Sequence, residues 1–261
     1  MFQQIAPFVL GVVAIWFLIA YFANTSIIRS STGARTLERK ENKRVYNLVE
    51  NLCMSMGMTM PKVNVIEDNA LNAYASGINN DTYTVSLTRG IINKLDDDEL
   101  EGVIAHELAH IRNRDVRLLI VSIVFVGIFA MLTQIAFRTL LRTPGRSNNK
   151  NGKGAIFIVL IALIVATIGY FCTTLMRFAI SRKREYMADA AAAEMTRQPQ
   201  ALASALRKIS RNPNIDAVKR DDVAQLFIEH PIRKKSLSAG IASLFATHPP
   251  IEKRIEILEQ F

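Results

Sequence analysis

The chain of 261 residues contains 32 Lys and Arg against 23 Asp and Glu, which gives a net charge of +9 at neutral pH. Hydrophobic residues make up 50% of the chain, and its mean hydropathy is positive, at +0.17. These values exclude a disordered or low-complexity protein. The two cysteines, Cys53 and Cys172, lie far apart, which excludes a disulfide framework and a Cys-rich zinc or iron–sulfur site. Strong hydrophobicity combined with positive charge is typical of a membrane protein whose basic residues flank its spans.

Three stretches of the chain lack charged residues over a length that can cross a bilayer. They are Ile5–Ile28, Leu118–Phe137 and Ala155–Met176. At a rise of about 1.5 Å per residue, ~20 helical residues span the ~30 Å hydrocarbon core. The alternative is a set of buried helices in a large soluble core, but core helices seldom run this long without a charge. We therefore expect about three transmembrane helices.

The first stretch could instead be a cleaved signal peptide. The residues before it contain no Lys or Arg, whereas many basic residues follow it within Arg29–Arg44. This order favours an uncleaved anchor at 1–28, with the N-terminus outside and the next segment in the cytoplasm. The basic residues of the loop Arg138–Lys153 oppose this topology. A hairpin at 118–180 that dips into the bilayer without crossing it would also satisfy these charges.

The remaining segments have mixed polarity and predict helices and a small sheet. Apolar residues at helical spacing predict an amphipathic helix at about 38–57. Short alternating runs at 63–66 and 82–87 predict strands of a small antiparallel sheet. The acidic run Asp96–Glu99, followed by apolar residues at helical spacing, predicts a helix from about 97 to 114. After the third apolar stretch, helices are expected at about 184–196, 200–211 and 250–260.

The pattern His-Glu-x-x-His at 106–110 carries the strongest chemical signal, and it lies on the helix expected at 97–114. Residues four apart on an α-helix are offset by only about 40°, so His106 and His110 project from one face. Two imidazoles at this spacing suit one zinc ion. Glu107 can reach the attacking water from the side, accept its proton and pass it to the leaving amine. The alternative is a chance match on an amphipathic helix, but two of the chain's four histidines stand here at ligand spacing.

A catalytic zinc of this type needs a third protein ligand. No histidine follows at the spacing of the extended His-Glu-x-x-His pattern, so the ligand must come from elsewhere on the same side of the membrane. Glu185, on the segment that returns from the apolar hairpin, is the candidate ligand. Asp189, four residues further on, is a candidate to orient a ligand imidazole. The alternative for Glu185 is a solvated side chain that pairs with Arg182 or Lys183.

Four separated motifs in the same order resemble the HtpX-type membrane zinc metalloproteases, which belong with the CAAX prenyl proteases. They are HELAH at 106–110, SRKREYMADAAAAE at 181–194, NAYASG at 72–77, and THPP at 247–250 with Arg254. The likeness covers nearly the whole chain from about residue 40. It implies a zincin-type metalloprotease domain within a predominantly helical α+β integral membrane protein that holds one zinc ion per chain. The chain departs from the family in having one apolar stretch before the protease domain, where members commonly have two.

The resemblance also implies how the site is built. Zinc is expected to be held by His106, His110 and Glu185, with Glu107 as the general base. An edge strand beside the cleft is expected to pair with an extended substrate through backbone hydrogen bonds. Its residues are Asn72, Ala73, Tyr74 and Ala75.

The resemblance further implies that two residues near the C-terminus support the transition state. The imidazole of His248 would stabilise the oxyanion, and Arg254 would hold the segment in place. The alternative for His248 is a helix-capping His-Pro at a surface turn. His230, which is also followed by proline, is expected to be a simple loop residue.

Together these expectations predict a membrane-bound zinc endopeptidase that cuts polypeptides at the cytoplasmic face of a bacterial inner membrane, and the resemblance suggests misfolded membrane proteins as substrates. The chain would divide into an anchor at 1–28, protease halves at 29–117 and 181–261, and a transmembrane hairpin at 118–180. A prenyl-peptide protease would need a closed chamber of more helices. A non-catalytic scaffold with a structural zinc site would be expected to lose Glu107. Anionic lipid explains the positive charge better than nucleic acid, because basic residues flank the apolar stretches and no recognition motif is present.

Overall fold

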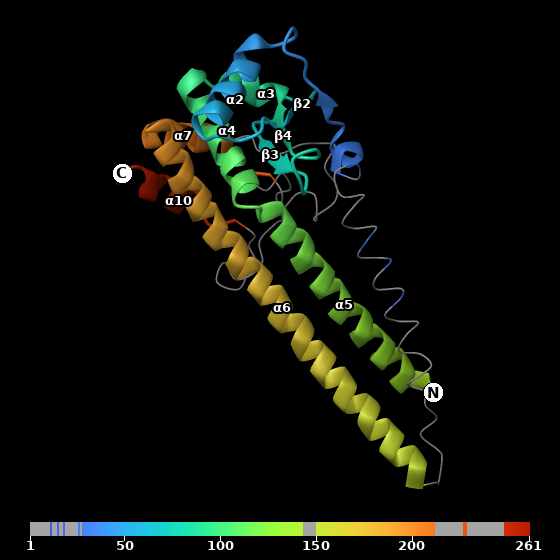
Figure 1. Cartoon of the computed structure of the whole chain (residues 1–261). Coiled ribbons are helices and arrows are strands. Elements are labelled where there is room, and N and C mark those ends of the chain that lie inside the picture. The colour runs from blue at the N-terminus through green and yellow to red at the C-terminus, as the bar shows by residue number, and fades with distance from the viewer. Residues whose placement is uncertain are drawn as a thin grey trace.

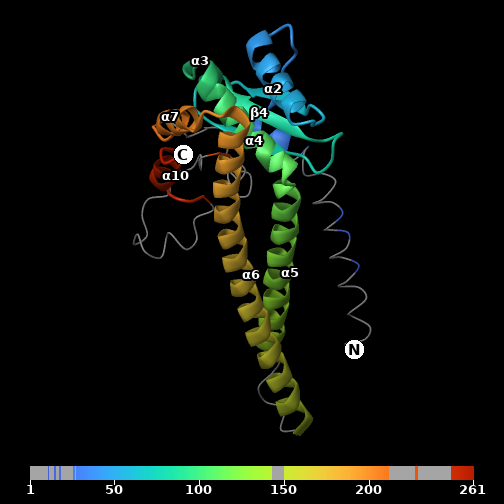
Figure 2. The same ribbon diagram turned by 60° about the vertical axis from the view of Figure 1, so that its left-hand side comes forward.

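Two long helices, α5 (Asp115–Arg142) and α6 (Lys150–Thr196), extend side by side from a head that holds the sheet and the shorter helices (Figure 1, Figure 2). The computed structural model describes residues 28–142, 150–211, 227–228 and 248–261, together with positions 11, 15, 18 and 26. Most of the first apolar stretch therefore lies outside the described residues.

The sheet has the strand order β1-β2-β4-β3. Its strands are β1 (Arg35–Thr36), β2 (Lys62–Ile66), β3 (Ala73–Ser76) and β4 (Thr84–Thr88). β2 and β4 run parallel, whereas β3 and β4 run antiparallel, so the expectation of a purely antiparallel sheet was wrong. The physical reason is that the chain reverses at β3 on the far edge before β4 enters next to β2. Gly77 begins that reversal with a φ of +100°, a left-handed conformation that favours glycine.

Helix α4 (Asp97–Arg112) lies against the sheet and carries the His-Glu-x-x-His pattern. It begins where the sequence predicted, because the Asp96 side chain accepts from the Glu99 backbone N–H and the Glu99 side chain accepts from the Asp96 N–H. This reciprocal capping satisfies two backbone donors that a helix start otherwise leaves without partners. Nearly every residue from Glu99 to Ile111 is buried, so α4 is the central helix of the head.

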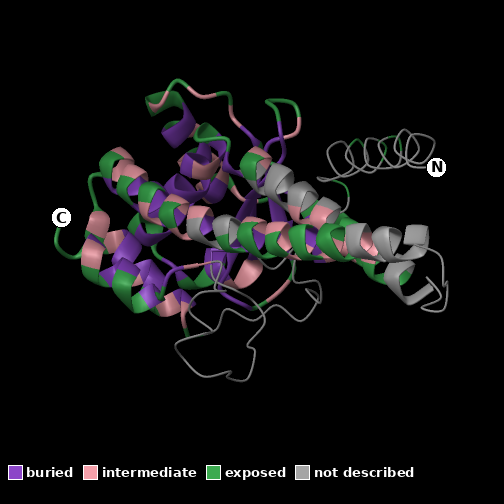
Figure 3. Cartoon of the chain, turned by 90° about the horizontal axis from the view of Figure 1, so that it is seen from below, coloured by how far each residue is buried: buried purple, intermediate pink, exposed green. Residues whose placement is uncertain are grey.

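In the described part of the chain, four shorter helices surround the sheet and α4. They are α2 (Lys43–Ser55), α3 (Arg89–Lys94), α7 (Pro199–Ile209) and α10 (Ile251–Leu258). The helix predicted at 38–57 starts later than expected, because Asn42 caps α2 by accepting from the Val45 N–H. Figure 3 shows the buried residues gathered in the head, where segments from both sides of the α5–α6 hairpin share one core. The predicted halves 29–117 and 181–261 both contribute to that core.

Helix α6 contains two segments that were predicted as separate elements. They are the third apolar stretch and the helix expected at 184–196. Among the described residues, one helical segment, Val159–Thr196 of α6, has the length and hydropathy to cross a membrane. Large apolar side chains are exposed along its first half. These are Leu160, Ile161, Ile164, Val165, Ile168, Phe171 and Leu175. The second apolar stretch lies within α5 and is helical.

Glu99 ties the start of α4 to α7 through a buried carboxylate. Its oxygens accept hydrogen bonds from the Ser204 hydroxyl at 2.7 Å, from the Lys208 ammonium at 2.6 Å and from the Asp96 backbone N–H at 3.1 Å. Burial raises the pKa of Glu99, but these donors outweigh burial and hold the pKa below its ordinary value. A carboxylate with a lowered pKa stabilises the fold above the pKa of the unfolded chain, and that stability is lost as the pH falls through the folded-state pKa.

We expect Glu99→Gln to lower the free energy of unfolding by about 1–3 kcal/mol near neutral pH, because a buried charge-assisted contact is lost. The difference in unfolding free energy between this variant and wild type should vanish once the pH falls below the folded-state pKa of Glu99. Urea unfolding in detergent, followed by circular dichroism across this pH range, checks the prediction. Glu101→Gln is the matched control, because burial and then Asp98 raise the pKa of Glu101, so loss of its charge should not destabilise the fold. A deficit in Glu99→Gln that persists at low pH would contradict the assignment.

Candidate metal centre and active site

The centre of the site is the buried face of α4. His106 and Glu107 are almost completely buried, and His110 lies one turn further along the same face. Their spacing brings the two imidazoles together, with 3.1 Å between the Nε2 atoms. The positions of His106 and His110 therefore agree with the prediction, made from their four-residue spacing, that both lie on one helix face.

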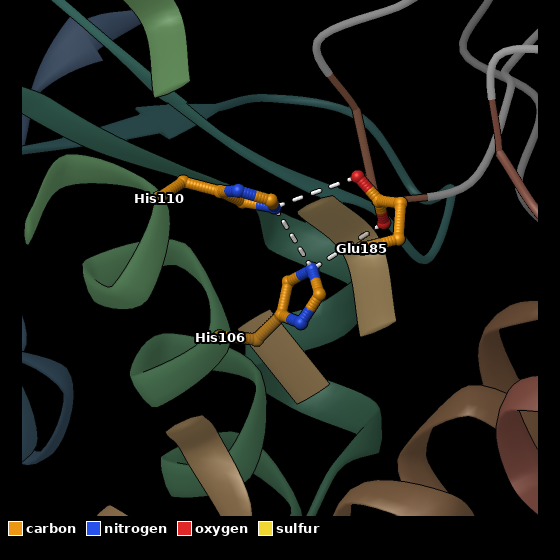
Figure 4. Close-up of side chains that lie close together, drawn as sticks. All are labelled: His106, His110 and Glu185. Carbon is orange, nitrogen blue, oxygen red and sulfur yellow. Dashed lines mark hydrogen bonds and ion pairs between the residues drawn. The ribbon is translucent and has the colours of Figure 1, made fainter. Parts of the chain in front are cut away.

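Glu185 reaches this pair from α6, after the chain has passed through the whole α5–α6 hairpin (Figure 4). Its Oε2 atom lies 3.6 Å from His106 Nε2, and its Oε1 atom lies 3.6 Å from His110 Nε2. One ligand atom from each of the three side chains lies within 4.8 Å of the others. Tetrahedral zinc ligands at about 2.0–2.1 Å from the ion lie ~3.3 Å apart. The donor set and its spacing therefore fit zinc.

Glu107 lies beside the three ligands without being part of the group. Its side chain is buried, and neither carboxylate oxygen has a hydrogen-bond partner among the described residues. Burial raises the pKa of Glu107, because the charged form loses its hydration. A buried carboxylate without a protein partner next to a metal site is suited to hold a water molecule and exchange a proton with it.

His106 is oriented from behind by Asp189, whose Oδ1 lies 2.9 Å from His106 Nδ1. Arg254 of α10 in turn donates two hydrogen bonds to Asp189, from Nε to Oδ2 at 2.8 Å and from Nη2 to Oδ1 at 2.7 Å. Burial lowers the pKa of His106, but Asp189 and Glu185 outweigh burial and raise it to about 9. The carboxylates thus favour positive charge at this imidazole, and a bound zinc ion would supply that charge in place of the proton.

The two residues near the C-terminus also lie at the site. His248 is mostly buried, with Nδ1 3.3 Å from Glu185 Oε2, so its side chain faces the ligands rather than a surface turn. Arg254 is fully buried, with Nη1 3.2 Å from Glu185 Oε2 and Nη2 3.4 Å from His106 Nε2. His230 lies outside the described residues.

The predicted substrate strand is the outermost strand of the sheet, but its outer edge already has a partner. Ala73, Tyr74 and Ala75 belong to β3, and Asn72 directly precedes it. Tyr74 forms an antiparallel bridge with Phe227, and the Ile228 N–H donates to the Ala73 carbonyl at 2.9 Å. Arg254 links this short pair to the metal centre, because its Nη1 donates to the Ile228 carbonyl at 3.1 Å.

Sequence reasoning missed two contributors to the site. Asp115 lies 2.7 Å from His110 Nδ1, and Phe227–Ile228 covers part of β3. An acidic residue within two turns of a ligand histidine was a visible signal for Asp115. Nothing in the local pattern around residue 227 indicated that this segment pairs with residues more than 150 positions earlier.

We expect Glu185→Ala to lose most of its zinc, because one of the three ligands found among the described residues is removed. Asp189→Ala should retain more zinc but bind it more weakly, since removal of a residue that orients a ligand typically costs about 10–100-fold in affinity. Metal analysis of the purified full chain after dialysis measures both. Glu194→Ala is the matched control, because Glu194 is exposed on the same helix. Full zinc occupancy in Glu185→Ala would remove this residue from the ligand set.

Comparison with known proteins agrees with this site. Residues 39–261 match Peptidase family M48. The chain is 69% identical to a protein named Protease HtpX homolog from Bacteroides fragilis (strain ATCC 25285), over 100% of this chain and 82% of that protein. It is 40% identical to a Protease HtpX homolog from Listeria monocytogenes serotype 4a (strain HCC23), over 94% of this chain and 83% of that protein.

A solved structure shares the fold. The crystal structure of S. mikatae Ste24p matches with a TM-score of 0.59 at 18% sequence identity. The match covers 96% of this chain and 56% of the Ste24p chain, so the present protein spans little more than half of that structure's length. The family match across most of the chain, the close relatives and the His-His-Glu geometry agree, and the chain therefore belongs to peptidase family M48, as a zinc metalloprotease.

Proposed function

We propose that this protein is a membrane-bound zinc endopeptidase that hydrolyses polypeptides at the cytoplasmic face of a bacterial inner membrane, with misfolded membrane proteins among its substrates. One observation carries the proposal. Glu107 lies buried, without a hydrogen-bond partner among the described residues, beside the point where His106, His110 and Glu185 converge. A structural zinc site has no need of an extra buried carboxylate next to its ligands. This argues against the alternative of a non-catalytic scaffold.

The proposed chemistry assigns one task to each group. Zinc, when bound, acts as a Lewis acid that polarises the scissile carbonyl and makes water a better nucleophile. Glu107 accepts the proton of the attacking water and delivers it to the nitrogen of the leaving amine. His248 donates a hydrogen bond to the developing oxyanion. Arg254 holds Asp189 and the α10 segment in place, since its guanidinium is already engaged with that carboxylate.

Substrate is proposed to add to the sheet at the outer edge of β3. An extended peptide can form backbone hydrogen bonds with an exposed edge strand whatever its side chains, which suits a protease of broad specificity. Ile228 already uses the Ala73 carbonyl on this edge. Pairing along the full strand therefore requires Phe227 and Ile228 to leave it.

The proposed membrane setting is supported by the α5–α6 hairpin. The exposed apolar side chains of α6 form a surface suited to lipid rather than to water. A fully crossing hairpin would return Glu185 to the side of the membrane on which α4 lies. Three spans, the cytoplasmic location of the head and membrane-protein substrates all belong to this proposal.

We expect Glu107→Gln to abolish proteolysis while zinc remains bound, because the amide cannot accept the proton of the attacking water. A loss of at least ~10²-fold in kcat is expected for a general base. Casein or membrane-substrate cleavage, with and without chelator, measures activity, and metal analysis measures zinc in the same samples. Glu101→Gln, on the same helix, is the matched control. A Glu107→Gln variant that cleaves at the wild-type rate would show that the base is misassigned.

We expect Ile228→Pro to increase cleavage of long peptides, because proline has no N–H to donate to Ala73. Loss of one backbone hydrogen bond worth about 1 kcal/mol corresponds to ~5-fold in kcat/KM. A peptide too short to reach β3 should show no change. Ile228→Val keeps the N–H and serves as the control. If Ile228→Pro lowers cleavage of long peptides only, the pair contributes to substrate binding instead of competing with it.

A further inference from the structure

The chain breaks its helical path directly after the His-Glu-x-x-His pattern. α4 ends at Arg112, Asn113 caps it, and Arg114 has a φ of +59° before α5 begins at Asp115. In an unbroken α-helix, a residue five positions after His110 would be rotated by about 140° from it and would point away. The left-handed residue at 114 turns the chain, so the side chain of Asp115 comes back towards His110.

Asp115 contacts the ring nitrogen of His110 that faces away from the other ligands. Its Oδ2 lies 2.7 Å from His110 Nδ1, whereas His110 Nε2 lies 3.1 Å from His106 Nε2 and 3.6 Å from Glu185 Oε1. Asp115 is also buried. A carboxylate at Nδ1 holds the proton on that nitrogen and leaves the Nε2 lone pair for a metal ion.

Arg184 joins Asp115 to the second helix of the hairpin. Its Nη1 donates to the Asp115 carbonyl at 2.5 Å and lies 3.8 Å from Asp115 Oδ1. Arg184 directly precedes Glu185 on α6, and its side chain is mostly buried. These contacts therefore link the start of α5 to the turn of α6 that carries Glu185.

We propose that Asp115 is a positioning residue for His110, and that Arg184 makes this positioning depend on the packing of α5 against α6. Each imidazole on α4 then has its own orienting carboxylate. Asp189 of α6 serves His106, and Asp115 of α5 serves His110. A displacement of either long helix at the base of the hairpin changes the direction in which His110 presents Nε2. The inference rests on the His-His-Glu zinc site and not on the identity of the substrate.

Zinc affinity of the purified full chain in detergent, measured by competition with a chelator, tests the role of Asp115. We expect Asp115→Ala to weaken zinc binding about 10–100-fold. Asp115→Asn should lose less, because its carbonyl oxygen still accepts the hydrogen bond from Nδ1. The visible absorption bands of the Co²⁺-substituted protein should shift in the same order. Asp81→Ala, which alters an exposed acid between β3 and β4, should match wild type.

A double-mutant cycle tests the role of Arg184. We expect Arg184→Gln to weaken zinc binding in the wild-type background and to have almost no further effect in Asp115→Ala, because Arg184 acts through Asp115. Lys183→Gln, at the exposed neighbouring position, should leave zinc binding unchanged. Full additivity of the two substitutions would overturn the link to α6.

Two further outcomes separate this inference from the proposed function. If Asp115→Ala and Asp115→Asn both bind zinc with wild-type affinity and unchanged Co²⁺ spectra, Asp115 does not position His110. If Asp115→Ala fails to fold, the isosteric Asn variant still tests the role, because loss of the carboxylate charge should lower its zinc affinity and shift its Co²⁺ spectrum, and wild-type values for both would overturn the inference. Suppose that the Asp115 variants lose zinc affinity as expected but the wild-type protein cleaves no polypeptide. The endopeptidase proposal then fails and the positioning role stands.

Discussion

A buried network of opposite charges holds the metal centre where α4, α6 and α10 meet. Arg254 is fully buried and binds Asp189 with two hydrogen bonds, and Asp189 in turn lies against His106. Removing one partner of a buried ion pair typically costs about 3–5 kcal/mol, because a charge is left without compensation in a poorly polarisable interior. The network therefore ties α4, α6 and α10 to one another. The same groups orient the imidazole, so stability and zinc binding depend on the same contacts.

The α5–α6 hairpin imposes the second constraint. α6 is a single helix of 47 residues, so the turn that carries Glu185 moves with the apolar turns before it. A slip of α6 by one helical turn would displace Glu185 by about 5.4 Å, which exceeds the reach of a zinc–carboxylate bond. The packing of the two long helices therefore sets the register of the metal site. Arg184 and Asp115 lie at the point where that register is transmitted to the ligands.

Several parts of the site could be predicted because they depend on residues close together in the sequence. Asp96 and Glu99 cap α4 within a single turn, and the spacing of His106 and His110 places both on one helix face. The third ligand could not be predicted from local spacing, because Glu185 lies beyond the α5–α6 hairpin. Its prediction depended on the return of the chain to the same side of a membrane and on the resemblance of the motif around it. The prediction of an antiparallel sheet was wrong, because the direction of each strand depends on where β3 joins the sheet and not on the alternation of residues within a strand.

The sequence by itself determined the types of the main elements, the two imidazoles and the acid between them, since helix caps and side-chain periodicity act over one or two turns. Only the tertiary structure decided which carboxylate faces which imidazole and which segment covers the edge of β3. Asp189 meets His106, Asp115 meets His110, and Ile228 meets Ala73. Such pairings follow from helix packing and from the turn of the chain at Arg114, and side-chain periodicity within one helix does not determine them.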